Sequence, residues 1–402
     1  MLSIADQGFE VFLVEKTDVL GGIALKIDHN IEGHDIFEYL QGLREQVLNH
    51  KLINVFTNSQ LSRVDGFIGN FTSIIENRNG GGPAELETHE FDHGVAIVAT
   101  GGAATKPDEY LYGKSNKVTT LLELNERIGA STFTVPDTVV MIQCVGSREP
   151  EHMYCSRVCC TGAIKNAIRM KEMRPEAAII ILYREIRTYG FREKYYTQAR
   201  EMGIIFIRYD LDDKPLVKEK DNRIIVSVRD SILEADIDIP ADLLVLSSRI
   251  DPNSDNEHLS QFFKVPINSE KFFLEAHVKL KPVDFATDGV FLCGLAHYPK
   301  DIKETITQAR AVASRAATIL SKDTFDAAGK ISYVNETRCS GCGTCVTVCA
   351  YNAVTVDEVR AVAVINEALC KGCGACAATC RGSAIMLHGF EDQQIFKMLS
   401  IV

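Results

Sequence analysis

Two cysteine runs near the C-terminus share one spacing, and this repeat constrains the chain more than any other feature. CSGCGTCVTVC spans Cys339–Cys349 and CKGCGACAATC spans Cys370–Cys380, so each run is C-x2-C-x2-C-x3-C. Three closely spaced thiolates suit the corners of a cubane, and in this pattern the fourth cysteine of each run ligates the other cluster. We therefore predict two [4Fe-4S] clusters. Their ligand sets are Cys339, Cys342, Cys345 and Cys380 for the first, and Cys370, Cys373, Cys376 and Cys349 for the second.

Zinc is the alternative for these runs, because CxxC pairs also bind zinc. A zinc site takes four ligands, whereas the two runs supply eight in the rhythm of paired clusters. The segment Lys330–His388 resembles a bacterial-type two-cluster ferredoxin domain, and we expect an α+β domain over 330–402. One departure bears on loop rigidity and reduction potential: proline usually follows the last cysteine of each run, but Ala350 and Arg381 stand there.

The rest of the composition bounds the compartment and the partners. No apolar run approaches the roughly 18 residues of a membrane span, and the N-terminus lacks the basic region and cleavage site of a signal peptide. We therefore expect a cytoplasmic protein, in which thirteen cysteines indicate metal binding rather than disulfides. A formal charge of -11 argues against nucleic acid or an anionic membrane as a partner.

Three upstream segments predict an α/β dinucleotide-binding fold. FEVFLVE, Phe9–Glu15, predicts a strand that ends in a carboxylate, which in Rossmann units binds the adenosine ribose. A lone glutamate at a strand end is otherwise usually solvent-facing. GVAIVATGG (Gly94–Gly102) and DGVFLCG (Asp288–Gly294) predict buried strands that run into glycine turns. The order of these segments resembles the FAD domain of thioredoxin-reductase-like flavoproteins. We expect flavin contacts at Glu15, Lys16, Gly21, Gly22, Thr100, Gly101, Gly294, Lys300 and Ile302.

The G-x-G-x-x-G fingerprint of such a domain would precede Leu2 together with its strand. Without that strand, pyrophosphate contacts at a helix N-terminus are lost and a central position of the parallel sheet is open. We expect either that Met1 is an internal methionine of a truncated gene, the reading we favour, or that another polypeptide supplies the unit. Flavin binding is accordingly an expectation for the complete protein.

A second βαβ unit follows, and its first turn is unusual. TVVMIQCVGS predicts a strand and turn, AIKNAIRMKEM an amphipathic helix, and AAIIILYRE the next strand. A nicotinamide-binding version would place closely spaced glycines in that turn. Four cysteines in the pattern C-x10-C-x3-CC stand there instead, beside a helix N-terminus that favours negative charge. A third [4Fe-4S] cluster, a vicinal disulfide, buried free thiols and zinc all remain open from spacing alone. The four are Cys144, Cys155, Cys159 and Cys160.

Four further strings favour the cluster, because they resemble those of a known family. They are CVGSR (Cys144–Arg148), YCSRVCC (Tyr154–Cys160), YREIRTYG (Tyr183–Gly190) and PKDIKETITQA (Pro299–Ala309). With the ferredoxin-like tail, they resemble HdrA, the flavin-binding component of heterodisulfide reductase, and its bacterial relatives over nearly the whole chain. The resemblance implies that the four loop cysteines bind an unusual [4Fe-4S] cluster near FAD, which makes three clusters.

The resemblance also implies a role for Lys165, which is expected near N5 of the isoalloxazine. A positive charge there would favour the reduced flavin. Apart from the family, Lys165 is equally well a solvated helix lysine. Two family features are missing here, an N-terminal cluster domain and a ferredoxin insertion after the LGG segment, since LGG runs on through IALKIDHNIEGHDIFEYLQGL without cysteines. We therefore assign no electron route through those clusters to this chain.

From the resemblance we expect an oxidoreductase component that passes electrons between FAD and its clusters. The expected partners are HdrB- and HdrC-like proteins, a hydrogenase or formate dehydrogenase module, and ferredoxin as the acceptor in flavin-based bifurcation, with a homodimer inside a larger complex. A self-contained NAD(P)H-dependent flavoenzyme and a flavin-free electron wire are the alternatives. The expected domains are 1–135 and 251–325 for FAD, 136–250 for the second Rossmann-like unit, and 330–402 for the ferredoxin.

The remaining predictions concern connecting architecture. IFEYLQGLREQVL predicts an amphipathic helix, and SIIENRNGGGPAELETHEFD two strands around a glycine-rich hairpin. KDIKETITQARAVASRAATIL predicts a long helix whose N-terminus faces the flavin ring in this family. We expect Cys293 to be a small core residue. An isolated histidine such as His297 is more often structural or solvent-facing than functional.

Overall fold

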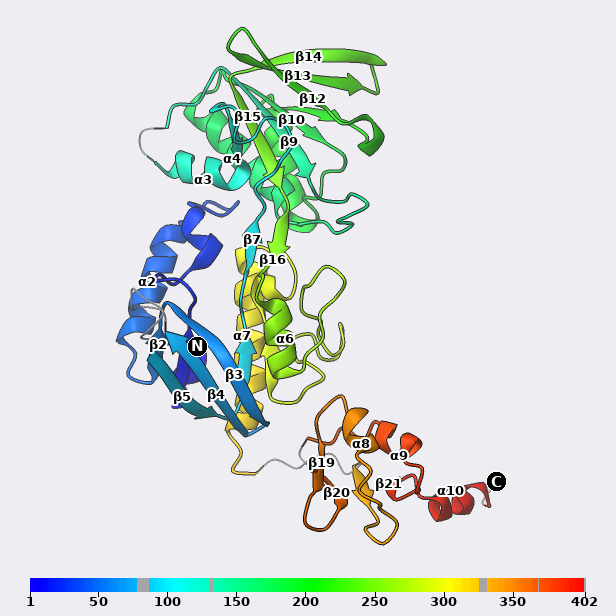
Figure 1. Ribbon diagram of the computed structural model, residues 1–402. Helices are drawn as coiled ribbons and strands as arrows, with labels where there is room; N and C mark the ends of the chain where they lie inside the picture. Colours follow the sequence, from blue (N-terminus) through cyan, green and yellow to red (C-terminus); the bar gives the residue numbers. More distant parts are fainter. Residues whose placement is uncertain (78–86, 131–132, 325–330, 368, 401–402) are drawn as a thin grey trace.

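The computed structural model has three parts in a row, with a parallel-sheet unit at one end and the cysteine-rich tail at the other (Figure 1). It describes residues 1–402 except 78–86, 131–132, 325–330, 368 and 401–402. The chain starts in the middle part, enters the sheet unit, returns to the middle part and ends in the tail. Within the described ranges, no helix is both long and apolar enough to cross a membrane.

A five-stranded parallel sheet forms the core of the end unit, in the order β11-β10-β9-β15-β8. The central strand β9 is an apolar run buried on both faces, as parallel strands between two layers usually are. Its neighbours β10 and β15 are almost as buried. The strands are β8 (Val118–Thr120), β9 (Thr138–Val145), β10 (Ala178–Tyr183), β11 (Ile205–Arg208) and β15 (Leu243–Ser248).

Successive side chains of β9 point to opposite faces of this sheet. Met141 packs beneath the helices, whereas Val140 and Ile142 pack beneath a three-stranded meander. The covering helices are α3 (Leu121–Gly129), α4 (Cys159–Met173) and α5 (Glu193–Glu201), and the meander is β12 (Leu216–Lys220), β13 (Arg223–Asp230) and β14 (Ala235–Ala241). Two short 3-10 turns lie in loops of the end unit: η2 (Gly190–Arg192) precedes α5, and η3 (Leu211–Asp213) precedes β12. The predicted βαβ unit is therefore confirmed as β9–α4–β10.

The sheet begins earlier in the chain than the sequence predicts. β8 pairs with β15, and α3 packs against α4 in the same core. Both elements lie within the range 1–135 expected for the FAD domain, so the second unit takes in residues from 118 onward. β8 has only three residues, too few for any hydrophobic period to reveal it.

The middle part is built from two separated segments of the chain. β1 (Val11–Val14) pairs in parallel with β2 (Ile53–Phe56), and β6 (Ala96–Val98) pairs in parallel with β17 (Val290–Leu292). Among the described residues these are two separate two-stranded sheets. The meander here comprises β3 (Ser59–Phe67), β4 (Asn70–Asn77) and β5 (Glu87–His93), so the two predicted hairpin strands are confirmed, while the turn at 78–86 lies outside the described residues.

Helix α7 (Ile302–Leu320) runs along the middle part and closes its core. Val312 and Ala316 of α7 pack with Phe291 and Cys293 from the β17 segment, which confirms Cys293 as a core residue. With 19 residues and a rise of 1.5 Å per residue, α7 is about 28 Å long. The other helical elements of the middle part are α1 (Leu2–Ala5), η1 (Gly22–Lys26), α2 (Ile36–Asn49), α6 (Asn256–Phe263) and η4 (Gly294–Ala296).

Two antiparallel crossing strands, β7 (Gly102–Ala104) and β16 (Ile250–Pro252), join the middle part to the end unit. The tail hangs from the far end of α7 as a compact α+β domain. In it β18 (Ser332–Val334) pairs with β21 (Ile385–Leu387), and β19 (Val354–Asp357) with β20 (Val362–Ile365). Its helices are α8 (Thr344–Thr347), α9 (Ala375–Thr379) and α10 (Asp392–Leu399).

One ion pair ties the tail to the middle part. Lys371 Nζ, in the second cysteine run, lies 2.5 Å from an Asp288 carboxylate oxygen just before β17. The two side chains are 21% and 43% exposed, so solvent screens the pair and its contribution to stability is small.

Candidate iron-sulfur and flavin sites

The cysteines of the tail surround its small core. Cys345 and Cys376 are buried between α8, α9 and the strands, and Cys339, Cys349 and Cys380 pack against the same cluster of apolar side chains. Burial raises the pKa of the Cys345 thiol, and the neighbouring Cys339 and Cys342 raise it further. The first three cysteines of that run therefore share one site.

Backbone amides point at sulfur atoms throughout the tail. Ser332 N–H donates to Cys370 Sγ at 3.3 Å, and its hydroxyl lies 3.4 Å from Cys376 Sγ, so one serine contacts two members of the second run. Similar N–H donors reach the sulfurs of Cys339, Cys349 and Cys380 at 3.2 to 3.3 Å. Such hydrogen bonds stabilise thiolates and tune the potential of a cluster that they hold.

The four cysteines of the long turn also come together, at the carboxyl end of β9. Cys144 is the penultimate residue of β9 and adopts a left-handed φ of 63°, which turns the chain sharply. Cys159 and Cys160 open α4, and Cys155 lies in the loop between. The hydrogen bond that Cys159 donates to Cys160, together with burial, raises the pKa of Cys159, and Cys144 and Cys155 raise it further.

Cys160 has the opposite shift. Its pKa is lowered to about 7, first by the hydrogen bond with Cys159 and then by the Arg187 backbone and the charges of Arg187 and Arg148. Burial raises the pKa of Cys144, against the pull of Arg184 and Arg148. The Cys160 thiolate therefore forms near neutral pH beside two thiols, Cys144 and Cys159, whose pKa values are raised. A bound metal cluster would stabilise its ligands as thiolates.

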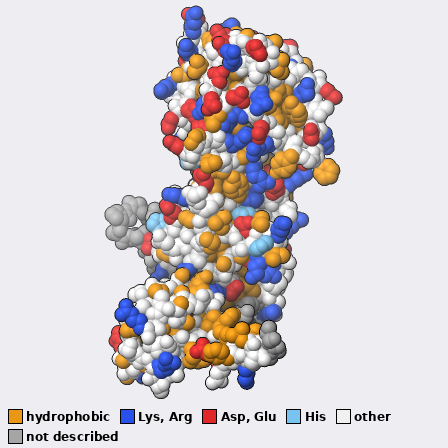
Figure 2. Space-filling model, turned by 90° about the vertical axis from the view of Figure 1, so that its right-hand side faces the viewer, with side chains coloured by type: hydrophobic (Ala, Val, Ile, Leu, Met, Phe, Trp, Pro, Cys, Tyr) orange, Lys and Arg blue, Asp and Glu red, His pale blue; other side chains and the backbone are white. Residues whose placement is uncertain are grey.

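Arginines form a cationic shell around this cysteine loop, and sequence reasoning missed them. Arg184 donates to the carbonyls of Cys144, Ser147 and Arg148, which fixes the turn. Arg148 and Arg187 both form ion pairs with Glu185, and their charges also lower the pKa of Cys160. On the face drawn in Figure 2, Lys and Arg side chains gather where the end unit meets the middle part. The string YREIRTYG supplies Arg184 and Arg187, so their positions were visible but not their role.

Several buried donors next to these cysteines have no hydrogen-bond partner among the described residues. They include Arg148 Nη1, Arg184 Nε and the hydroxyl of Thr161, which follows Cys160 in the first turn of α4. Unpaired buried donors are costly unless a bound group accepts from them. Four adjacent thiols, a cationic shell and free donors fit an anionic [4Fe-4S] cluster with sulfide acceptors.

The loop cysteines lie farther apart than the ligands of a single metal ion. Across the ranges that the structure describes, no three His, Cys, Asp or Glu side chains converge closely enough to hold one ion. A cubane spreads its four cysteine sulfurs over the corners of a cage, whereas a zinc ion draws them onto one point.

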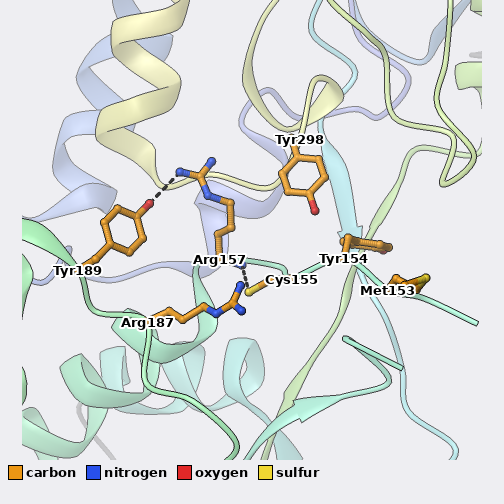
Figure 3. Close-up of a pocket in the computed structure, with 7 residues that line it drawn as sticks. All are labelled: Met153, Tyr154, Cys155, Arg157, Arg187, Tyr189 and Tyr298. Atoms are coloured by element: carbon orange, nitrogen blue, oxygen red, sulfur yellow. Dashed lines mark hydrogen bonds between the residues drawn. The ribbon is translucent and has the colours of Figure 1, made fainter. Parts of the chain in front are cut away.

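An open pocket of about 480 Å³ lies beside Cys155 (Figure 3). Arg157 N–H donates to Cys155 Sγ at 3.3 Å, and the Arg157 guanidinium bonds Tyr189 Oη at 2.8 Å and Glu304 of α7 at 3.0 Å. Arg187 extends toward the same sulfur. The remaining lining residues are Met153, Tyr154 and Tyr298. Cys155 is thus the member of the set closest to solvent, and its loop touches the start of α7.

Lys165 lies at the junction between the end unit and the middle part. Its ammonium bonds Asp28 Oδ1 at 2.8 Å, the His29 carbonyl at 3.0 Å and the Asn125 side chain. Burial lowers the pKa of Lys165, and Asp28 opposes that shift. Burial opposes charge on Asp28 too, yet Lys165 lowers the pKa of this carboxyl. Lys165 is therefore a largely buried, ion-paired lysine rather than a solvated one, and Asp28 is a partner that no sequence signal indicated.

The residues expected at the flavin lie around the same junction. Lys16 Nζ pairs with Asp255 at 2.7 Å, and Thr100 Oγ1 donates to Asn256 at 2.9 Å, so the ends of β1 and β6 meet at the start of α6. Glu15 directly follows β1 and accepts two hydrogen bonds from Thr17 at 2.8 Å each. Gly21 and Gly22 lead into η1, whose following loop carries Asp28.

The segment that follows β17 also reaches this junction. The ideal Cβ position at Gly102 lies 3.6 Å from Leu295 Cβ, which sets Gly294 beside the turn at Gly101. Lys300 Nζ donates to the Gly294 carbonyl at 2.6 Å, and Ile302 begins α7. Gly22 (φ 53°) and Gly101 (φ 73°) have left-handed backbones with no atom within 4 Å of an added Cβ, which leaves room for a ligand.

One hydroxyl at the start of α7 is available to a bound ligand. Thr305 Oγ1, in the first turn of α7, is buried and has no partner in the part of the chain that the structure describes. The N-terminus of α7 also carries partial positive charge. Open glycines, an orphaned hydroxyl and a helix N-terminus fit the pyrimidine edge of a flavin, which accepts hydrogen bonds.

The chain was compared with known proteins. A family model described as a 4Fe-4S dicluster domain matches residues 338–384. The chain is 32% identical to an iron-sulfur HdrA protein of the CoB-CoM heterodisulfide reductase of Methanopyrus kandleri, with 89% of this chain and 68% of that protein covered. It is also 32% identical to the corresponding component of the H2/formate:CoB-CoM heterodisulfide, ferredoxin reductase of Methanococcus maripaludis, with the same shares covered.

Solved structures resemble about four fifths of the chain. Thioredoxin reductase of T. acidophilum matches with a TM-score of 0.52 at 13% identity, covering 80% of this chain and 94% of that one. Thioredoxin reductase of Lactococcus lactis matches with a TM-score of 0.53 at 14% identity and the same coverage. These likenesses concern the fold alone. They confirm the predicted architecture of thioredoxin-reductase-like Rossmann domains followed by a two-cluster ferredoxin domain.

Proposed function

The chain belongs to the HdrA family of iron-sulfur proteins of heterodisulfide reductase, and from this premise we propose that it is an electron-transferring iron-sulfur flavoprotein within a larger complex. It passes electrons between FAD and three [4Fe-4S] clusters. Two clusters are held by the eight tail cysteines, and the third by Cys144, Cys155, Cys159 and Cys160.

One observation carries this proposal: sulfur and arginine fill the turn after β9, where a nicotinamide enzyme places glycines. The four loop cysteines lie close enough to shift one another's pKa values. Arg148 and Arg184 offer them unpaired donors. A pyrophosphate would find no glycine-rich seat at this position, which argues against a self-contained NAD(P)H-dependent flavoenzyme.

FAD would be held in the middle part. Glu15, Lys16, Thr100 and Gly101 would take the adenosine and pyrophosphate side, and Gly21, Gly22, Gly294, Lys300 and Ile302 the isoalloxazine side. Lys165 would lie near N5, where its charge favours the reduced flavin. The bound flavin would supply the exchange between two-electron and one-electron chemistry, and the chain supplies its position and charge.

The partners follow from the relatives. One relative's name specifies H2 or formate, the CoB-CoM heterodisulfide and ferredoxin. By analogy we propose that HdrB- and HdrC-like proteins and a hydrogenase or formate dehydrogenase module dock on this chain. Flavin-based bifurcation with ferredoxin as the low-potential acceptor, within a homodimer in a larger complex, belongs to the same proposal.

Anaerobic reduction of the purified protein tests this function. Iron and flavin analysis should give about twelve irons per chain, from three cubanes, and one FAD per chain. Reduced ferredoxin or a partner protein should bleach the flavin, whereas NADH and NADPH should not. Rapid bleaching by NADPH would support the nicotinamide-dependent alternative, and absence of flavin with full iron would support a flavin-free wire.

A further inference from the structure

A chain of hydrogen-bonded side chains leads away from Gly294, and the proposed function leaves it without a role. Gly294 N–H donates to Gln308 Oε1 at 2.9 Å, Gln308 Nε2 lies 2.9 Å from His297 Nδ1, and His297 Nε2 lies 2.8 Å from Glu275 Oε2. The four residues come from the η4 turn, α7 and the loop after α6. His297 and Glu275 are mostly buried, with 22% and 13% of their side chains exposed.

The direction of each bond is fixed by the donor at one end. A backbone N–H can only donate, so Gln308 must present its oxygen to Gly294 and its amide nitrogen to His297. His297 Nδ1 is then an acceptor, and its proton resides on Nε2, which donates to the Glu275 carboxylate. The arrangement therefore holds His297 neutral, in one tautomer.

Three charged groups act on His297. Lys300 approaches from the turn before α7, Arg157 from the cysteine loop and Glu275 from the loop after α6. Burial lowers the pKa of His297, the two cations lower it further, and Glu275 opposes them. Extra negative charge at this junction would offset the two cations and favour a second proton on the ring.

A second proton on Nδ1 cannot coexist with the present orientation of Gln308. Nδ1–H would face the amide NH2, so Gln308 must turn its oxygen toward His297. Its NH2 group then faces the Gly294 N–H, which loses its acceptor. Protonation of one side chain is thereby converted into release of one backbone donor, at the turn expected to contact the flavin.

We propose that Glu275, His297 and Gln308 form a proton-operated switch that keeps the Gly294 amide bonded internally when His297 is neutral and frees it toward the flavin when His297 is protonated. The inference deepens the proposed function and rests on its placement of the flavin beside Gly294. The three side chains are positioning residues, because they act through the Gly294 amide.

The switch couples electron transfer to proton uptake. Negative charge that a reduced flavin would bring beside α7 would favour the state with the freed amide. His297 Nδ1 would then bind one proton from solvent and release it when that charge is removed, and no covalent bond of the protein would break. By linkage, protonated His297 raises the affinity of the flavin for electrons.

Amide exchange on the flavin-free protein tests the switch directly. The wild type should exchange the Gly294 amide roughly fivefold faster at about pH 5 than at about pH 7.5, after correction for intrinsic rates, because one net hydrogen bond is lost. His297→Gln, which can bond both neighbours but does not titrate, should abolish this difference. His258→Gln, an exposed histidine of α6, should behave as wild type.

Spectroelectrochemistry of the flavin-loaded protein supplies the second readout. Relative to His297→Gln, the wild-type potential should fall by an additional 30 mV or so per pH unit where His297 titrates, about 30 mV being a tenfold change for a two-electron couple. Gln308→Met, which breaks the connection to Gly294 and leaves His297 intact, should reduce the extra slope.

These two measurements separate the switch from the function on which it rests. Equal slopes in the wild type and His297→Gln, or Gly294 exchange that ignores pH, would overturn the switch. Failure of the protein to bind flavin would instead overturn the proposed function, and the exchange experiment would still decide whether the switch exists.

Discussion

At the residue scale, the cysteine loop depends on neighbours that compensate its charge. Cys144, Cys159 and Cys160 are buried, and four thiolates without a metal could not share so small a space. Arg148, Arg184 and Arg187 lie against them, so the site is prepared for an anionic group before any cofactor arrives.

Removing a loop cysteine should therefore remove one cluster and leave the other two. We expect Cys160→Ala to lower the iron content from about twelve to about eight per chain, because each cubane holds four irons, with the paramagnetic signals of the tail clusters unchanged. Cys293→Ala is the matched control, since Cys293 is a buried cysteine that belongs to none of the proposed cluster ligand sets. Unchanged iron in Cys160→Ala would contradict the third cluster.

Lys300 gives the flavin-free protein a pH dependence. Burial, followed by the charge of Arg157, lowers its pKa to about 8, while an unfolded lysine titrates near 10.4. Between these values the unfolded chain binds more protons, so stability rises with pH, and below pH 8 the cost of burying the charge is fully present.

Lys300→Met should remove that slope. Between pH 8 and pH 10.4, we expect the unfolding free energy of the wild type to rise by about 2 kcal/mol more than that of the variant. Urea unfolding followed by far-ultraviolet circular dichroism is suitable, because the chain has no tryptophan. Parallel pH profiles would show that Lys300 does not titrate in this range.

The cysteines that we propose as cluster ligands could be found in the sequence by their spacing, whereas the residues that contact the site come from distant parts of the chain. Eight tail cysteines follow a local pattern that any reader of the sequence can find. Asp28 binds Lys165 across 137 positions, and no local rule anticipates such a contact. Arg148 and Arg184 belong to the sequence strings CVGSR and YREIRTYG, but their orientation toward sulfur is a property of the folded turn.

At the element scale, the predictions held where the hydrophobic signal was long. β9 and β10 are continuous apolar runs, and α7 has a clear helical period, so all three were predicted close to their observed bounds. β7, β8 and β16 have three residues each, and they form because they pair with neighbouring strands. Tertiary pairing, rather than propensity, determines such short strands.

The start of α7 combines a cap with an ion pair. Asp301 accepts a hydrogen bond from Glu304 N–H at 2.8 Å, and it also binds Arg192 of the end unit. An N-cap is worth about 1 kcal/mol. The same carboxylate thus stabilises the helix and anchors one part of the molecule to another.

Two substitutions should separate these roles. Asp301→Ala should lower the melting temperature by roughly 2 to 4 °C for a domain of this size, because it removes both the cap and the charge. Asp301→Asn keeps the cap and removes only the charge, so a smaller decrease is expected. Equal losses in the two variants, measured by calorimetry, would assign the effect to the ion pair.

At the scale of the whole molecule, the ion pair Lys371–Asp288 joins the tail to the middle part. An exposed pair contributes about 0 to 1 kcal/mol and weakens with salt. The position of the tail should therefore respond to small changes in charge.

Lys371→Glu should loosen the tail. Small-angle X-ray scattering should show a larger radius of gyration for this variant, and for the wild type at high salt. The double variant Lys371→Glu, Asp288→Lys restores opposite charges and should recover the compact value. A radius that does not change in any of these samples would mean that apolar contacts hold the tail.

The length of α7 has a kinetic consequence. Its first turn reaches Arg157 in the cysteine loop at 3.0 Å, and its last residue, Leu320, lies at the end from which the tail departs, about 28 Å away. Two carrier proteins could thus sit on opposite poles at once without excluding each other. Steady-state turnover with both carriers varied should then give intersecting double-reciprocal lines, the mark of a ternary complex, rather than the parallel lines of alternating occupancy.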